Sequence, residues 1–383
     1  MDQQGSSERK GAGRVVLPMA PASCGTEDVP AKAPGMDQPF VEGVHAGPRG
    51  DIPRVGSRLR SADRWGTIKA RLGVGRMRYA IDPGLYALGS PDETSPVLVS
   101  ANYKMSFDCL RSALPGRDAW ILVLDTKGIN VWCAAGKGTF GTAELVRRIE
   151  TSGLKDIVSH RTVILPQLSA PGVAAHTVKE RSGFSVQYGP IRARDLGAYL
   201  DAGLKATPQM RCMTFALRDR AVLIPIELFE ALKAALIVVP VMFIASGFLG
   251  QGGFADNLAG DGLFTLLALG LSILAGAVLM PLLLPYLPGR AFAAKGFAIG
   301  AATALLLIAG WGSDLSTWRG ALHAAAWIMI PAAIAGYLAM NFTGASTYTS
   351  LSGVRREMRW AVPLEIGTAA AGIIMWIASG VIA

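Results

Sequence analysis

Hydrophobic positions are distributed unevenly along the chain, and the pattern changes near residue 230. Beyond it lie five long apolar stretches, at about 232–249, 263–287, 291–311, 320–340 and 362–382. Each reaches or approaches the ~17–25 residues that cross the hydrocarbon core of a bilayer. Because five such stretches leave almost no polar helix face to meet water, we predict an all-α transmembrane domain of five helices at 230–383.

The loops between these stretches predict how the helices are oriented. Basic residues concentrate in cytoplasmic loops of membrane proteins. The second and fourth loops hold five of them, and the first and third hold one: Arg290, Lys295, Arg355, Arg356 and Arg359, against Arg319. We therefore expect a multi-pass protein of the cytoplasmic (inner) membrane, with its N-terminal domain in the cytoplasm and its C-terminus outside.

Residues 51–229 alternate short β-rich runs with helical stretches. The runs are VLVSAN (97–102), AWILVLD (119–125), TVILPQ (162–167) and SVQYGP (185–190). This alternation predicts an α/β fold, a Rossmann-like parallel sheet covered by helices. Ligands of such sheets bind beyond the carboxyl ends of the strands, here at 100–102, 125–128, 166–167 and 189–190.

Composition narrows the partners of this domain. Residues 1–50 are rich in Gly, Pro, Ser and charge, so we expect a disordered leader there. The net charge is +9, but aromatic residues do not interleave with Lys and Arg, which argues against nucleic acid. The four cysteines form no C-x-x-C pair, so neither a zinc site nor an iron–sulfur cluster is expected in this chain.

The segment LDTKGINVWCAAGKGTFGTAELV, residues 124–146, holds the candidate chemistry. Gly136, Gly138 and Gly141 satisfy G-x-G-x-x-G, but the first glycine lies eleven residues past Asp125, too far from the end of the strand for a nucleotide loop. Two interpretations of Cys133 remain. It is an ordinary small core residue, or it is a thiolate ligand of a soft or borderline metal.

The small residues after Cys133 are compatible with the ligand interpretation. Ala134, Ala135 and Gly136 have little side-chain bulk, which lets backbone approach a large flat ligand. A position near a helix N-terminus, with Lys137 close by, favours the thiolate.

The octapeptide NVWCAAGK, Asn130–Lys137, resembles the cap-helix motif of the membrane-bound corrinoid proteins of microbial mercury methylation. The resemblance extends from about residue 85 to 383 and includes HRTVILPQLSAPGVAAH and VQYGPIRARDL. The segment MNFTGASTYTSLSGVRREM resembles a stretch that the family shares with its soluble relatives. That family is related to the large subunit of the corrinoid iron–sulfur proteins of the acetyl-CoA pathway. The resemblance implies a cobalamin-type corrinoid, with the Cys133 thiolate as lower axial ligand of cobalt.

The resemblance also implies which residues contact the cofactor. These are Asn130, Val131, Trp132, Cys133, Ala134, Ala135, Gly136 and Lys137. Ser100, which closes a strand, and Ser106, which we expect to cap the next helix, are further candidate polar contacts. Cys109 and Cys212 are either relays for Hg(II) or, more simply, buried structural thiols.

The implied activity is that of a corrinoid-dependent methyltransferase, which moves a methyl group from cobalt to Hg(II) and forms methylmercury. Its methyl donor would be methyltetrahydrofolate, acting through a methyltransferase. Because this chain has no cysteine cluster, the reductant would be a separate ferredoxin-like protein with two [4Fe–4S] clusters. One alternative is a membrane-anchored corrinoid methyl carrier of one-carbon or acetyl-CoA metabolism that does not act on mercury. A more distant one is a transporter or sensor with a corrinoid-binding domain.

Overall fold

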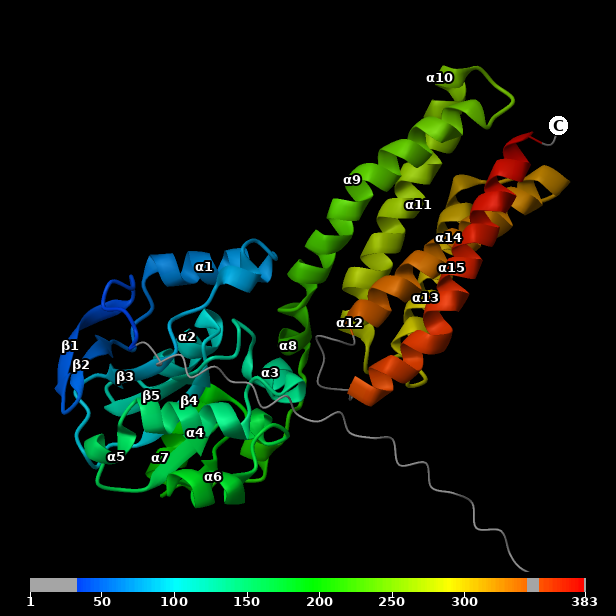
Figure 1. The fold of residues 1–383 in the computed structure, drawn as a ribbon. Coiled ribbons are helices and arrows are strands. Elements are labelled where there is room, and N and C mark those ends of the chain that lie inside the picture. Colours follow the sequence, from blue (N-terminus) through cyan, green and yellow to red (C-terminus); the bar gives the residue numbers. More distant parts are fainter. Residues whose placement is uncertain (1–32, 343–350, 382–383) are drawn as a thin grey trace, which may run out of the picture.

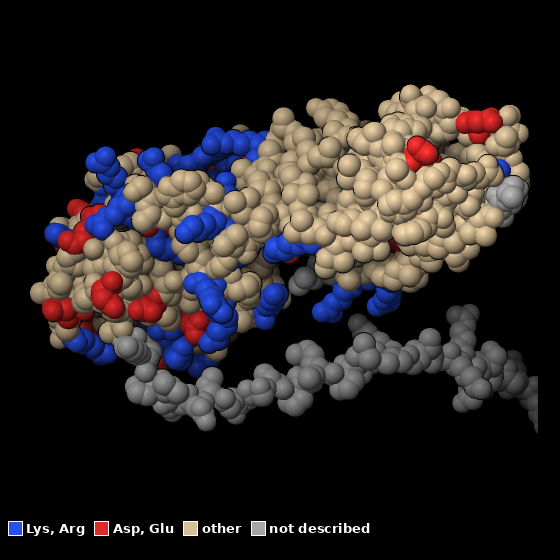
Figure 2. All heavy atoms as spheres, turned by 90° about the horizontal axis from the view of Figure 1, so that it is seen from above, with Lys and Arg blue, Asp and Glu red and all other residues tan. Residues whose placement is uncertain are grey.

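The computed structural model describes residues 33–342 and 351–381. Figure 1 shows two regions joined through α8 and α9: an α/β domain, and a group of long helices that extends away from it. The charged side chains follow this division. Lys, Arg, Asp and Glu cover the α/β domain in Figure 2, whereas the helical region is almost free of charge between its two ends.

The α/β domain is built on one seven-stranded sheet with the order β1-β2-β3-β5-β4-β6-β7. The strands are β1 Val41–Gly47, β2 Gly50–Val55, β3 Gly84–Leu88, β4 Val97–Ala101, β5 Ala119–Leu124, β6 Thr162–Leu165 and β7 Ser185–Tyr188. Strands β5, β4, β6 and β7 are parallel, as the sequence predicts. Every residue of β3, β4 and β5 is buried, because helices cover both faces of the sheet.

The helices of this domain follow the strands in the expected alternation. They are α1 Ser61–Arg71, α2 Lys104–Ser112, α3 Val131–Lys137, α4 Thr142–Thr151, α5 Leu154–Ile157, α6 Ala175–Ser182, α7 Leu196–Asp201 and α8 Leu217–Ala221. Short 3₁₀ turns lie at Arg76–Arg78, Gln167–Ser169, Ala193–Asp195 and Gln209–Arg211.

Three sequence expectations differ from the structure. The sheet is mixed, because β3 runs antiparallel to β5 and β1 forms an antiparallel hairpin with β2. Strand β1 lies inside the segment 1–50 that we expected to be disordered; its Gly-rich composition obscures an alternating burial pattern. Ser106 is the third residue of α2 rather than its cap, since the helix begins at Lys104. Residues 1–32 lie outside the described residues.

Five helical segments of the second region are long and apolar enough to cross a membrane. They are Leu217–Phe248, Phe254–Leu283, Phe292–Trp311, Trp318–Asn341 and Gly353–Val381. Their helices are α9 Ile224–Phe248, α10 Phe254–Asn257, α11 Leu263–Leu274, α12 Met280–Leu283, α13 Phe292–Trp311, α14 Trp318–Asn341 and α15 Leu351–Val381. The first segment also includes α8, which links the two regions. Two π-helical turns, Leu258–Gly262 and Ala275–Leu279, link α10, α11 and α12 into one segment.

Helices α13 and α14 pack closely at two glycines. A Cβ atom added to Gly300 would lie 2.5 Å from the carbonyl oxygen of Pro331 and 2.7 Å from Cβ of Ala335, and one added to Gly296 would also collide with α14. The spacing Gly296-x-x-x-Gly300 is thus a helix contact, as small residues at this spacing often are in membrane helices.

Candidate cofactor site

A cavity of about 460 Å³ opens at the carboxyl ends of β4, β6 and β7. Of the expected strand-end positions, Ser100, Pro166, Gly189 and Pro190 line it, whereas 101–102, 125–128 and 167 do not. Other lining residues come from distant parts of the chain, namely Arg71, Arg76, Tyr103, Ser106, Cys109, Asn130, Val131, Trp132, Val222, Leu223 and Ile226. The cavity therefore lies where the sheet, the α1 region, α3 and the beginning of α9 meet.

Asn102 organises the loop that leads into α3. Its side-chain oxygen accepts hydrogen bonds from the backbone N–H of Thr126 at 3.1 Å, the Thr126 hydroxyl at 2.8 Å and the N–H of Gly128 at 3.0 Å. The same hydroxyl lies 2.7 Å from the carbonyl oxygen of Ile129, so its single proton is shared between these two acceptors. Asn102 is nearly inaccessible to solvent, so this amide fixes the start of α3 relative to the end of β4.

Asn130 caps α3, because its side-chain oxygen accepts the backbone N–H of Cys133 at 2.9 Å. The helix ends at Gly138, whose φ of 82° places it in the left-handed region that favours glycine. Ala134 and Ala135 face inward and are buried in the core. A Cβ atom at Gly172 would lie 3.0 Å from Cα of Ala135, so the small side chains allow a close backbone approach.

The structure separates the expected site residues into three groups. Ser100, Ser106, Asn130, Val131 and Trp132 line the cavity together. Ala134 and Ala135 are buried against the protein, so their small size serves the packing of α3 rather than an open surface.

The third group lies away from the cavity lining. Gly136 and Lys137 are exposed. Cys133 is half-buried and follows Trp132 on α3, but it is not among the residues that line the cavity.

The glycines of the nucleotide-like fingerprint have ordinary structural roles. Gly136 lies within α3, Gly138 ends that helix, and Gly141 precedes the first residue of α4. The three positions form a helix-to-helix turn instead of a strand-to-helix turn. This arrangement supports the sequence argument against a nucleotide loop.

Two polar atoms of the cavity wall have no partner among the described residues. The Tyr103 hydroxyl and Nε of Arg71 are both buried and make no hydrogen bond. Burial raises the pKa of Tyr103, although the charges of Arg76 and Arg71 act in the opposite direction. Sequence reasoning missed both residues, because neither belongs to a motif. Unpaired buried groups of this kind are rare in folded proteins and mark places where a ligand can supply the partner.

The other thiols are more accessible than we expected. Cys109 and Cys212 are both exposed, so the expectation of buried structural thiols is wrong for the two of them. Cys109 faces the cavity from α2, where the surrounding protein raises the pKa of its thiol by desolvation. This shift keeps the group in its neutral form and makes it a poorer metal ligand than a thiolate.

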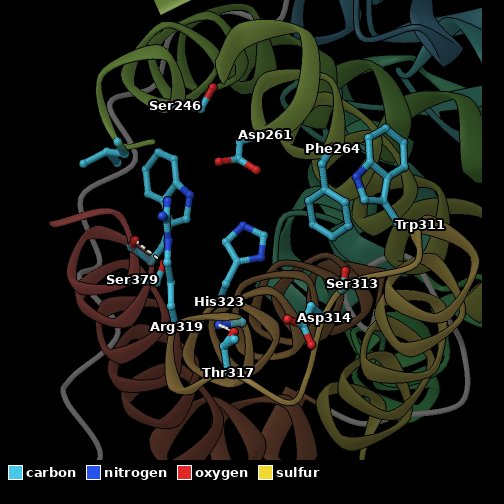
Figure 3. A pocket seen from close by; sticks show the side chains of 13 residues that line it. Ser246, Asp261, Phe264, Trp311, Ser313, Asp314, Thr317, Arg319, His323 and Ser379 are labelled. Carbon is cyan, nitrogen blue, oxygen red and sulfur yellow. Dashed lines mark hydrogen bonds between the residues drawn. The ribbon is translucent and has the colours of Figure 1, made fainter. Parts of the chain in front are cut away.

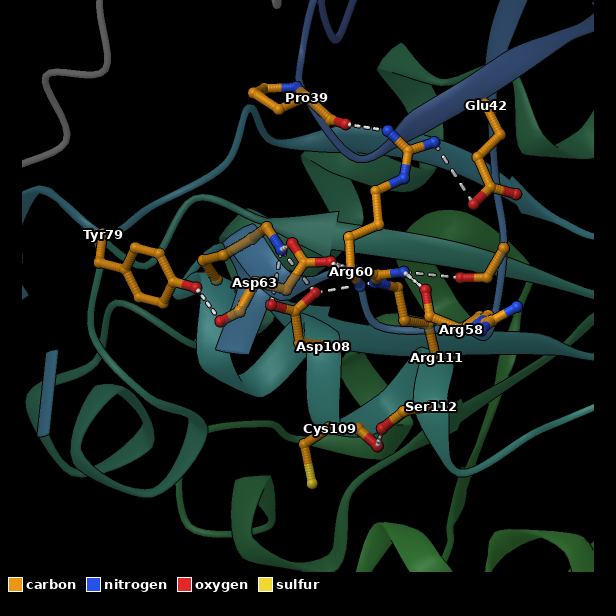
Figure 4. A network of polar contacts seen from close by, with 12 residues as sticks. Pro39, Glu42, Arg58, Arg60, Asp63, Tyr79, Asp108, Cys109, Arg111 and Ser112 are labelled. Atoms are coloured by element: carbon orange, nitrogen blue, oxygen red, sulfur yellow. Dashed lines mark hydrogen bonds and ion pairs between the residues drawn. The ribbon is translucent and has the colours of Figure 1, made fainter. Parts of the chain in front are cut away.

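A network of buried charges holds α1 against α2 beside the cavity (Figure 4). Lys104 Nζ contacts Asp63 at 2.7 Å and Asp108 at 2.5 Å, and Arg111 contacts the same two carboxylates at 2.8 Å each. All four side chains are buried. Since Ser106 and Cys109 lie on α2, and Arg71 ends α1, the network positions two walls of the cavity.

A second cavity, of about 250 Å³, lies in the helical region (Figure 3). Asp261, Trp311, Arg319 and His323 contribute to its lining, near the end of α13 and the beginning of α14. Nε2 of His323 has no partner among the described residues. Within residues 33–342 and 351–381, neither cavity contains three His, Cys, Asp or Glu side chains grouped as metal ligands.

The α/β domain is similar in sequence to subunits of acetyl-CoA-related enzyme complexes. The family described as CO dehydrogenase/acetyl-CoA synthase delta subunit matches residues 75–200. The acetyl-CoA decarbonylase/synthase complex subunit gamma of Methanopyrus kandleri is 35% identical over 124 residues, which is 32% of this chain and 26% of the relative. Subunit gamma 2 of Methanosarcina thermophila is 34% identical over 130 residues, 33% of this chain and 27% of the relative.

The matched segment covers the strand ends and α3 but none of the long apolar helices. The chain spans about a quarter of the length of the curated relatives that it matches. The similarity to the acetyl-CoA-related proteins is therefore a property of the α/β domain.

Proposed function

We propose that this chain is a membrane-anchored corrinoid protein that carries a methyl group for transfer. The observation that carries the proposal is the cavity at the carboxyl ends of the parallel strands, walled on one side by the α3 segment with its cysteine. The similarity to subunits of acetyl-CoA decarbonylase/synthase complexes supports a carrier related to acetyl-CoA metabolism.

The chemistry of the residues around the cavity suits part of a corrinoid, although the cavity, at about 460 Å³, is smaller than the whole cofactor. Its wall is mostly apolar, with Ser100 and Ser106 among the polar residues that line it. Tyr103 and Arg71 also line it, and the Tyr103 hydroxyl and Nε of Arg71 are buried without a partner among the described residues. A corrin ring is a broad apolar surface with amide and phosphate groups at its edge, and the two unpaired donors match those acceptors. Ligand pockets typically combine such an apolar lining with a few polar groups.

We assign Cys133 as the protein ligand of cobalt. When bound, the corrinoid supplies a cobalt ion that carries the methyl group. Asn130 holds the first turn of α3 through the N–H of Cys133, and Asn102 holds the loop before it, so the thiol is presented by a well-fixed backbone. Cys133 itself lies outside the cavity lining and directly follows Trp132, which belongs to it.

The helical region would serve as the anchor. Its five segments have the length and composition of membrane spans, and we propose the inner membrane with the α/β domain in the cytoplasm. A separate ferredoxin-like protein would supply electrons, and methyltetrahydrofolate would supply methyl groups through a methyltransferase.

Hg(II) is the second candidate for the methyl acceptor, beside the acceptors of acetyl-CoA metabolism. The octapeptide Asn130–Lys137 together with the five apolar segments favours it, because both features resemble the mercury-methylating family. A thiolate ligand donates electron density strongly, which suits transfer of the methyl group to an electrophile such as Hg(II).

The cofactor assignment is tested by expressing the full chain with ample cobalamin and measuring cobalt content and the visible spectrum. We expect one cobalt per chain and a spectrum that changes in Cys133→Ala. A Cys133→His variant should retain cobalt with an altered spectrum, since imidazole is a weaker donor. Cys212→Ala is the matched control, because Cys212 is exposed and does not line the cavity.

A cobalt-free wild-type protein would contradict the whole proposal. An unchanged Cys133→Ala spectrum would contradict only the ligand assignment. The acceptor is tested separately, by adding Hg(II) to the methylated, reduced protein and assaying methylmercury. If none forms while the protein still exchanges methyl groups with a pterin donor, the acceptor belongs to one-carbon metabolism.

A further inference from the structure

Helix α1 carries an apolar stripe on the side that faces away from the α/β domain. Trp65 is 62% exposed and Ile68 is 46% exposed, and Leu72 follows at helical spacing on the same face. Asp63 and Ala70, on the opposite face, are buried against the protein. The helix is thus amphipathic, with its inner face packed on the domain and its outer face open.

The exposed stripe continues beyond the helix and is bordered by positive charge. Val74 is 50% exposed and Met77 is 72% exposed. Residues 57–79 contain seven Lys and Arg and a single acid, Asp63, whose charge is paired in the buried network. The basic residues are Arg58, Arg60, Arg64, Lys69, Arg71, Arg76 and Arg78.

The end of α1 lies beside α9, close to Glu230. Gly73 has a φ of 79°, and a Cβ atom there would lie 2.9 Å from Oε1 of Glu230 in α9. Glu230 forms an exposed ion pair with Lys233 at 2.7 Å, and after this pair the rest of α9 has no charged residue, with Leu236 77% exposed. The α1 region therefore contacts α9 where that helix changes from polar to apolar.

Figure 1 shows α1 along the side of the α/β domain from which α9 leaves. In a membrane-inserted protein, the change from charged to apolar surface marks the level of the lipid headgroups. An amphipathic helix with Trp and bulky aliphatic residues on one face, flanked by Lys and Arg, is the type that lies in this interface.

We propose that α1 and the turn that follows it, residues 61–78, lie on the cytoplasmic membrane surface and bind anionic lipid. Trp65, Ile68 and Met77 insert among the headgroups, and Arg64 and Lys69 contact lipid phosphate. The helix thereby sets the orientation of the α/β domain toward the bilayer. This inference rests on the membrane placement of the helical region and is independent of the corrinoid.

The test uses the full chain in nanodiscs that contain phosphatidylglycerol. The four natural cysteines are replaced by serine, and a nitroxide label is placed at Ile68→Cys. The matched control is Lys179→Cys, an exposed position on α6, on the side of the domain away from the bundle. A third label at Leu306→Cys, which is 74% exposed on α13, reports insertion of the bundle.

We expect oxygen, which concentrates in lipid, to relax the labels at 68 and 306 more than a water-soluble nickel complex does, and the reverse at 179. A label at 306 that is exposed to nickel would contradict the membrane placement itself. Lipid contact at 306 together with nickel access at 68 would overturn only the inference on α1. Protection at 68 from both reagents would show cover by a second protein copy and would overturn it as well.

A second measurement leaves the natural cysteines in place. Lipids brominated on the acyl chain near the headgroup should quench part of the tryptophan fluorescence, and Trp65→Phe should remove that part. The Arg64→Glu, Lys69→Glu double variant should reduce the quenching in phosphatidylglycerol, whereas the Lys155→Glu, Lys179→Glu pair on exposed helix positions should not. Equal quenching in wild type and Trp65→Phe would contradict the proposal.

Discussion

The buried charge network of the α/β domain and the buried Glu365 of the helical region differ in how their charges are paired. In the domain, Asp63, Asp108, Lys104 and Arg111 are all buried, and each contacts two partners of opposite sign. In the helical region, Glu365 is only 5% exposed, and neither of its carboxylate oxygens has a partner among the described residues.

The difference separates structural polar groups from candidate functional ones. A fully paired network stabilises a unique arrangement, here the packing of α1 on α2, whereas an unpaired buried group costs free energy and persists where another function requires it. The Tyr103 hydroxyl and Nε of Arg71 are buried without a partner, as are the carboxylate oxygens of Glu365. By this criterion they are candidate functional groups, whereas the four charges of the adjacent network are structural.

The largest effect is expected from breaking the network. Arg111→Met leaves Lys104 as the one cation of this network beside Asp63 and Asp108, and removing one partner of a buried ion pair typically costs about 3–5 kcal/mol. Unfolding of the full chain in nanodiscs by urea, followed by circular dichroism, measures the loss. Arg117→Met is the control, since Arg117 pairs with the exposed Asp201 and such surface pairs contribute about 0–1 kcal/mol. Equal losses for the two variants would contradict a special role of the buried network.

The next largest effect is expected at the contact between α13 and α14, which is formed by uncharged residues. Gly300→Leu would force α13 away from Pro331 and Ala335, and overpacking of this kind costs about 1–3 kcal/mol. Gly310→Leu on the same helix is the matched control, because a Cβ atom there would meet nothing within 4 Å. Thermal unfolding in nanodiscs should show a lower Tm for the first variant and little change for the second.

A comparable but local effect is expected at Asn102. Asn102→Ala removes the acceptor of three hydrogen bonds and leaves buried N–H groups unpaired, at a cost of about 1–3 kcal/mol. The loop before α3 then loses the hydrogen bonds that fix it. We therefore expect the free energy of cobalamin binding to decrease by more than the free energy of unfolding. Equilibrium binding of cobalamin and urea unfolding, measured on the same preparation, separate the two. Thr94→Ala, which alters an exposed loop contact with Asp92, is the control.

Much of this architecture was predictable from local patterns, and the predicted parts share one property. Strands β4 to β7 and the five apolar segments are recognisable in the sequence because each has its own composition or periodicity. Strand ends at Ser100 and Gly189 could be assigned to one edge, since parallel strands place their carboxyl ends together.

The missed features depend on contacts between distant segments. The Arg71 contribution to the cavity requires α1 to pack on α2 through Asp63, which lies more than forty residues from Arg111. Asn102 resembles any polar residue after a strand until its bonds to the 126–128 loop are seen. Likewise, small residues at 134 and 135 predict a close approach but not which surface approaches them. The cobalt role of Cys133 stays a prediction.

The smallest effect is the acid dependence of the network. Burial acts to raise the pKa of Asp63, but the hydrogen bonds from Lys104 and from the backbone N–H of Arg60, with the nearby positive charges, outweigh it and hold the pKa below its usual range. A carboxyl group with a lowered pKa in the folded state stabilises the fold above its unfolded pKa, about 4, and that contribution is lost as the pH falls through the folded value. Stability of the α/β domain should therefore decline on acidification below about pH 4. Asp63→Asn should be less stable at neutral pH but should show a shallower decline, because one linked proton is absent. Urea unfolding at a series of pH values gives the free energy of unfolding of each protein as a function of pH. If this free energy falls equally steeply in wild type and Asp63→Asn, Asp63 does not contribute to the loss of stability in acid.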